Sequence, residues 1–187
     1  MSDTVVMSDP RPARRVDPPT ADAVGPSWAQ GPLEWRQTHW RRSEWELITG
    51  AERIGSLAAR GVIRERNTTR GPSGDWEFQE HSTGRTEITL LGSATPAARF
   101  RPHRWGGGAI STASGFRHDW VRVGFWKPEH AITNDYGFPC VRFLPHASAA
   151  RVACVVAIEP AGLRIPEVEA LVFLGWRLLV PRRAHAH

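Results

Sequence analysis

The stretch "EVEALVFLGWRLLV", from Glu167 to Val180, is the most apolar segment of a 187-residue chain that is otherwise polar and rich in arginine. Pro166 precedes it, Glu169 follows closely after Glu167, and Pro181 comes directly after it. Proline at the first helical position, acidic residues in the first turn and proline just past the end are typical of an α-helix. The sequence therefore predicts a helix over residues 166–180.

This predicted helix is apolar on nearly every side, because Glu169 and Arg177 are the only charged residues between Val168 and Val180. Such a helix has to be buried in protein or in lipid. Its length is roughly 20 Å at about 1.5 Å per residue, short of the roughly 30 Å core of a bilayer. Arg177 would add a cost of roughly 2.5–3.5 kcal/mol near a bilayer centre. We therefore expect protein, and not a membrane, to enclose the helix.

Short runs with strand character recur about every ten residues from Trp35 onward, separated by turn residues. The runs are 45–60, with a turn near Gly50, and 74–81, 86–92, 98–103, 107–115, 119–128, 130–145, with a hairpin turn at Asn134–Gly137, and 150–160. Before residue 166, only Glu52–Arg60 also fits a helical pattern. This spacing predicts an antiparallel meander that forms a sandwich or a barrel.

The helix favours the barrel, since a closed sheet can surround a helix and an open sheet cannot. We therefore predict a mainly β fold, a closed antiparallel β-barrel enclosing a hydrophobic C-terminal α-helix. The alternative is a β-sandwich with the helix across one open face, which would be expected to show a polar stripe. We expect a disordered Pro-rich tail over residues 1–27, the barrel over 28–181, and a short basic tail over 182–187.

The formal net charge is +5, and nearly all of the positive charge is arginine, since Lys127 is the only lysine. This bias reflects either codon usage or a basic surface for phosphate groups, nucleic acid or anionic lipid. The arginines are dispersed, which favours codon usage, and we expect no nucleic-acid partner. Cys140 and Cys154 do not form a CxxC pair, and we expect no metal site and no cofactor. The first residues lack the apolar core of a secretory signal, which favours a cytoplasmic location with two reduced thiols.

Several stretches resemble the tubby C-terminal-like superfamily, which includes tubby proteins, phospholipid scramblases and LURP-one-related proteins. The final "PEVEALVFLGWRLLV" is similar to the closing helix of that family, "GAISTASGFRHDWVRVGFWKPEHAITNDYGFPCVRF" to its repeated strand pairs, and "WELITGAERIGSLAAR" to an early hairpin. The resemblance covers roughly residues 35–180. It implies a barrel of about twelve strands around a central helix. Members of the family associate with membranes or phosphoinositides, or have no known activity. The sequence lacks the cysteine cluster and the acidic calcium-binding segment of the scramblase branch, so neither lipid scrambling nor calcium regulation is carried over.

Few residues suggest covalent chemistry. "HRWGGGAI", from His103 to Ile110, lacks the features of a phosphate-binding loop and is typical of a turn or bulge. His118 and Asp119, with Cys140, would be the elements of a Cys/His nucleophile, but no signature surrounds them. We assign no catalytic residue and expect the protein not to be an enzyme.

Tryptophan and arginine alternate in "EWRQTHWRRSEWEL", residues 34–47. Such a pattern packs at the start of a barrel with arginine facing solvent, or stacks on nucleic-acid bases or lies at a membrane interface. If the chain binds an anion, the expected residues are Arg36, Arg41, Arg42, Arg182 and Arg183.

These observations predict a monomeric, non-enzymatic binding module that contacts anionic phospholipid or a protein partner through an Arg-rich surface. It would be cytoplasmic or peripheral to a membrane. The alternatives are a structural, protein-assembly domain without lipid affinity and, ranked last, an enzyme with a Cys/His site.

Overall fold

The computed structural model describes residues 25–39, 44–58, 67–124, 126, 128–148 and 151–180. Residues 1–24 and 181–187, which hold most of the two predicted tails, lie outside this part of the chain. Gly25 and Pro26 lead into a short 3-10 helix, η1 (Ser27–Ala29), so that described structure begins slightly before the predicted boundary.

Twelve strands follow η1. They are β1 (Leu33–His39), β2 (Glu44–Thr49), β3 (Glu52–Ala58), β4 (Asn67–Gly71), β5 (Gly74–Glu80), β6 (Thr86–Leu90), β7 (Ala98–Pro102), β8 (Gly108–Thr112), β9 (Arg117–Arg122), β10 (His130–Asn134), β11 (Pro139–Ser148) and β12 (Arg151–Ile158). A second 3-10 helix, η2 (Gly162–Arg164), and the helix α1 (Val168–Leu179) complete the described chain.

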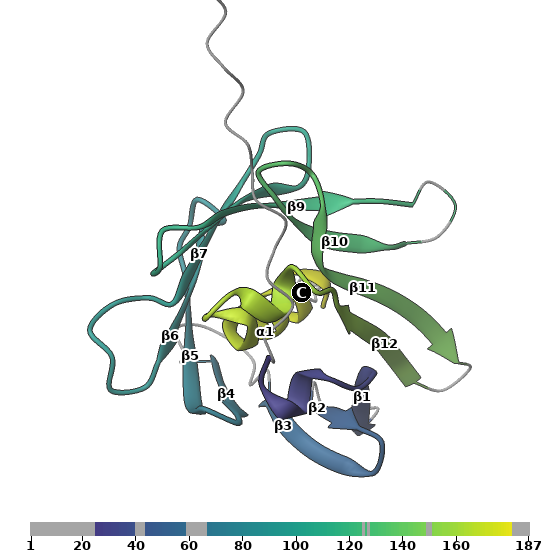
Figure 1. The fold of residues 1–187 in the computed structure, drawn as a ribbon. Coiled ribbons are helices and arrows are strands. Elements are labelled where there is room, and N and C mark those ends of the chain that lie inside the picture. Colours follow the sequence, from purple (N-terminus) through teal and green to yellow (C-terminus); the bar gives the residue numbers. More distant parts are fainter. Residues whose placement is uncertain are drawn as a thin grey trace, which may run out of the picture.

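The strands form a closed barrel in which each strand pairs antiparallel with the next one along the chain (Figure 1). The ring closes where β1 pairs with β12, with Leu33 opposite Val156 and Trp35 opposite Cys154. The predicted mainly β, closed antiparallel barrel is confirmed, and the sandwich alternative is wrong because this closing pair leaves no open face.

Helix α1 lies inside the ring of strands, and its residues from Val168 to Trp176 are buried (Figure 1). It starts two residues later than predicted, because the first α-helical hydrogen bond joins the Leu171 N–H to the Glu167 carbonyl. It ends one residue earlier, since Val180 is extended, the conformation favoured for a residue before proline. Among the described residues, no helix combines the length and the apolar character needed to cross a membrane.

Large side chains of the barrel wall fill the space around α1. Trp35 stacks on Trp176 with ring centroids 5.5 Å apart, and its edge meets Phe173. On another side the ring of Phe143 lies against Gly175, where an added Cβ would overlap the ring. Glycine is therefore required at position 175 for the helix to approach this wall so closely.

Two strands were not predicted, and one ambiguity is resolved. The stretch Glu52–Arg60, which also fitted a helical pattern, contains strand β3. Strand β1 was not predicted because its tryptophan belongs to a five-residue spacing that does not match the two-residue period of a strand. Strand β4 was not predicted because Thr69 is its main buried side chain, so it shows no alternation of apolar and polar residues. The "GGG" run forms the predicted turn, since Gly106 and Gly107 both have positive φ.

The barrel has two ends that differ in what they carry. We call the end where α1 starts the proximal end; it bears the turns after β2, β4, β6, β8 and β10. The distal end is where α1 terminates, beside the connections after β1, β3, β5, β7, β9 and β11. Two contacts show that α1 runs from the proximal to the distal end: Glu169 binds Ser73 in the β4–β5 turn, and Arg177 pairs with Glu80 at the end of β5.

We predict that Leu174→Asp abolishes cooperative folding, because it places an unpaired charge at a position that is 0% exposed in the core. Circular dichroism and thermal melting would test this. The matched control is Leu91→Asp, at a leucine that is 58% exposed in the β6–β7 turn and should tolerate the change. Melting of Leu174→Asp like that of the native protein would contradict the core position of α1.

Candidate functional site

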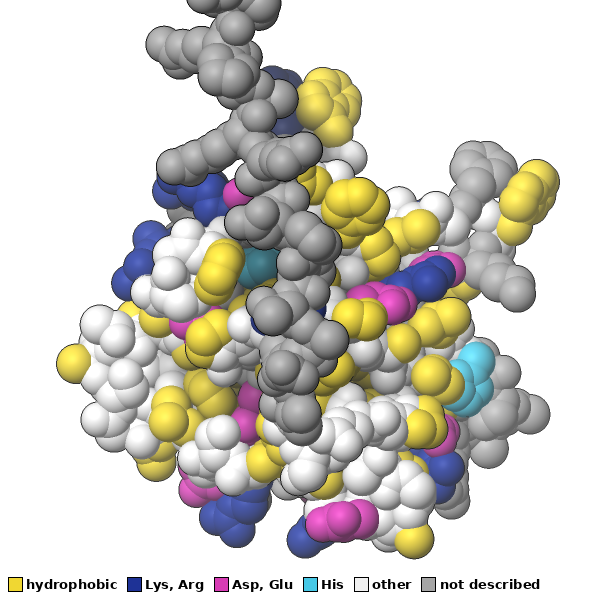
Figure 2. Space-filling view, viewed as in Figure 1, with side chains coloured by type: hydrophobic (Ala, Val, Ile, Leu, Met, Phe, Trp, Pro, Cys, Tyr) yellow, Lys and Arg dark blue, Asp and Glu magenta, His cyan; other side chains and the backbone are white. Residues whose placement is uncertain are grey.

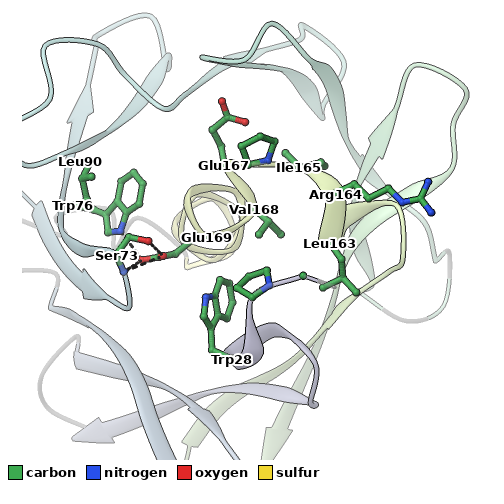
Figure 3. A pocket seen from close by; sticks show the side chains of 13 residues that line it. Trp28, Ser73, Trp76, Leu90, Leu163, Arg164, Ile165, Glu167, Val168 and Glu169 are labelled. Carbon is green, nitrogen blue, oxygen red and sulfur yellow. Dashed lines mark hydrogen bonds between the residues drawn. The ribbon is translucent and has the colours of Figure 1, made fainter. Parts of the chain in front are cut away.

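A cleft of about 500 Å³ opens at the proximal end, beside the start of α1 (Figure 3). Four separate parts of the chain form it: η1 with the residues just before it, the β4–β5 turn with the start of β5, the end of β6, and the segment from η2 into α1. Its apolar walls are Trp28, Trp76, Leu90, Ile165 and Val168. A concave, largely apolar site with a few polar groups is the usual form of a small-molecule site.

The main polar group of the cleft is the Glu169 carboxylate, whose residue is 5% exposed. It accepts hydrogen bonds from the Ser73 hydroxyl at 2.5 Å, the Ser73 backbone N–H at 3.2 Å and the Trp76 indole N–H at 2.8 Å. Its position in the first turn of α1 is favourable for a negative charge. All these donors are neutral, so no cation of the described chain pairs with this carboxylate.

The β4–β5 turn is shaped to meet Glu169. Gly71 and Gly74 face each other across the turn, and Gly74 has a φ of +131°, a conformation that favours glycine. A Cβ on Gly71 would overlap Glu169 and Phe173. The sequence "GPSG" therefore forms a tight turn that brings the N–H and hydroxyl of Ser73 onto the helix.

Two further charged residues line the cleft, and both point away from its centre. Glu167 accepts hydrogen bonds from the backbone N–H and the hydroxyl of Ser114, at 2.6 and 2.7 Å. Figure 3 shows the Arg164 guanidinium directed away from Trp28 and Val168. The centre of the cleft is therefore aromatic and aliphatic, with Glu169 as its charged group.

The residues of the hypothetical Cys/His site do not come together. His118 and Asp119 are consecutive on β9, so the His118 side chain is buried and that of Asp119 is exposed. Burial raises the pKa of the Cys140 thiol, whereas a nucleophilic cysteine needs a lowered one. Burial likewise raises the pKa of Cys154, to about 12. Both cysteines are free, and no described group of His, Cys, Asp and Glu could hold a metal ion.

The predicted anion-binding arginines fall mostly outside the described residues. Arg36 lies exposed on β1, where it pairs with Glu34 at 2.7 Å. Arg41 and Arg42 lie outside the described chain, between strands β1 and β2, and Arg182 and Arg183 lie outside it after Val180. The described chain ends that flank these four residues, His39, Glu44 and Val180, are all at the distal end.

The distal end carries exposed aromatic residues that the sequence did not single out. Trp105 in the β7–β8 turn and Trp126 in the β9–β10 connection are each 91% exposed, and Val123 is 53% exposed. The Arg104 guanidinium lies 5.6 Å from the centre of the Trp105 ring. Because β8 and β9 are neighbours, these two connections lie next to each other.

The cleft itself could not be read from the sequence. Glu169 was noticed only as a charge in the first turn of an apolar helix, and nothing linked it to Ser73, which lies 96 residues away. The useful signal is that a buried helix keeps a carboxylate only where donors satisfy it.

In comparisons with known proteins, no family model, no curated protein and no solved structure matched the chain. The resemblance to the tubby C-terminal-like superfamily therefore stays a prediction.

We predict that the protein loses stability as the pH falls below about 6.5, the ordinary pKa of histidine. Burial lowers the pKa of His118, and the backbone of Thr133 and nearby carboxylates offset this only in part. The unfolded chain then takes up the proton first, so stability falls as the pH drops from that value through the folded pKa. Burial lowers the pKa of His130 too, so part of the loss comes from that residue.

Urea denaturation across this pH range would measure the free energy of unfolding. In His118→Leu this free energy should fall less steeply as the pH drops. The control is His103→Leu, because His103 is exposed in the β7–β8 turn. Identical pH dependence of the native protein and His118→Leu would rule out His118 as a source.

Proposed function

We propose that the protein is a non-enzymatic binding module that docks on anionic membrane lipid through the distal end of its barrel. The observation that carries the proposal is the presence of two almost fully exposed tryptophans, Trp105 and Trp126, on neighbouring connections, with Arg104 beside Trp105. Tryptophan favours the interface between water and lipid, and each arginine near an anionic surface adds about 1 kcal/mol of attraction.

The arginines on the side wall of the barrel are paired with carboxylates, which favours the distal end over the side wall as the docking surface. On the outer wall Arg53 pairs with Glu46 at 3.0 Å, and Arg70 with Asp75 at 2.8 Å. Arg142 pairs with Glu129 at 2.5 Å. Figure 2 shows basic and acidic side chains next to each other at several places on the surface. A phosphate group would have to displace these carboxylates, so the wall offers few free positive charges.

Further arginines add positive charge at the distal end. Arg101 and Arg104 are exposed there, and the segments that hold Arg41, Arg42, Arg182 and Arg183 join the described barrel at the same end. The proposal thus keeps the arginines expected from the sequence, with Arg36 left out because of its pairing with Glu34. The tubby-like resemblance is consistent with this proposal, since some members of that family associate with membranes.

Flotation with liposomes tests the proposal. We expect the protein to float with vesicles of phosphatidylcholine and phosphatidylserine, to bind pure phosphatidylcholine weakly, and to be released by high salt. Trp105→Ala/Trp126→Ala should reduce binding about tenfold, since two interfacial side chains are lost. Arg41→Gln/Arg42→Gln should weaken only the component of vesicle binding that high salt abolishes.

Two control variants match these changes in number and type. Tyr136→Ala/Phe138→Ala removes exposed aromatic residues at the proximal end, and Arg53→Gln/Arg70→Gln removes paired arginines of the wall. Neither should alter flotation. If the native protein ignores anionic vesicles at low salt, the lipid proposal is wrong, and the protein-assembly alternative gains support.

A further inference from the structure

We infer that the proximal cleft binds a small organic cation, a protonated amine carried on a short apolar body. This site is separate from the distal end, and the inference does not depend on membrane docking. It rests on the shape of the cleft, the charge at its base and the aromatic residues around it.

The charge argument starts from Glu169. Its carboxylate is buried and accepts from three donors, all neutral, on Ser73 and Trp76. An ionised carboxylate has about four acceptor positions, so capacity remains for another donor. A positively charged donor would make a shorter and stronger hydrogen bond there than a neutral one.

The surroundings of Glu169 select the sign of the ligand. Glu167, the second acid at the cleft, is also held by neutral donors only, both from Ser114. Arg164, the one cation among the described lining residues, is directed away from the centre (Figure 3). Two carboxylates without a cationic partner in the described chain repel an anion and attract a cation.

The aromatic walls favour an organic cation over a metal ion. Trp76 and the half-buried Trp28 line the cleft, and indole faces attract ammonium groups through cation–π interactions. Leu90, Ile165 and Val168 supply apolar surface for an alkyl chain. A volume of about 500 Å³ lies within the range of small-molecule sites.

A titration with three probes of equal length tests the inference on the full-length protein. Hexylammonium should bind saturably, as followed by calorimetry, and about tenfold more tightly than hexanol or hexanoate, because only the cation can donate a charge-assisted hydrogen bond to Glu169. Similar affinity for the three probes, or no saturation with hexylammonium, would overturn the inference.

Two variants place the binding in the cleft. Trp28→Ala and Glu169→Gln should each weaken hexylammonium binding about tenfold. Their matched controls, Trp105→Ala at the distal end and Asp119→Asn on the outer wall, should leave it unchanged. If Glu169→Gln fails to fold, Trp28→Ala decides, and unchanged binding by folded Trp28→Ala would contradict the site.

The chain itself offers one competing occupant. Gly25 lies on the cleft, and the preceding residues include Arg11, Arg14 and Arg15. If replacing these three arginines by glutamine strengthens hexylammonium binding about tenfold or more, the cleft serves the chain's own basic segment, and the inference of a separate ligand is wrong.

Discussion

The structure depends on the enclosure of one apolar helix. Helix α1 is hydrophobic on nearly all sides, and its side chains from Ala170 to Leu174 are 0% exposed. No single open sheet could achieve this burial, so the strands must form a ring around the helix. The closing contact joins β1 to β12, the first and last strands of the barrel. Closure of the ring and burial of the helix therefore depend on each other, because the ring supplies the wall on every side of α1 and α1 fills the interior.

The two charged residues of α1 show how the helix is held along the barrel axis. Glu169 in the first turn binds Ser73 and Trp76, at the start of β5, and Arg177 in the last turn pairs with Glu80 at 2.6 Å, at the end of the same strand. Each charge also lies where the helix dipole favours it. Sliding the helix by one turn would separate both groups from these partners, which is costly for the buried Glu169. The residues that looked like exceptions in an apolar helix therefore set its position.

The fold could be predicted from local patterns, and the site could not. Strand β5 follows from the alternation of Trp76 and Phe78 with polar residues, and the β10–β11 hairpin from its turn, where Asn134 accepts the N–H groups of Tyr136 and Phe138. Strand β1 was not predicted, because Trp35 and Trp45 lie on different strands with a connection between them, so their spacing in the sequence shows no strand period. Both residues nevertheless contact Trp176. The cleft combines residues from η1, the β4–β5 turn and α1, and such convergence is a property of the closed barrel that no local period records.

The packing of α1 inside the barrel limits the places where a ligand could bind. Since α1 and the aromatic side chains around it fill the interior, the described barrel cannot hold a ligand in its lumen as hollow barrels do. The wall is also poorly suited, because its described arginines are largely paired with carboxylates of neighbouring strands. The two ends remain, and they differ in chemistry: acidic and aromatic with a cleft at the start of α1, exposed tryptophan and arginine where α1 terminates. With the interior filled and the arginines of the wall paired, the proposed membrane contact and the proposed amine site fall at opposite ends of the barrel, and they would not compete for the same residues.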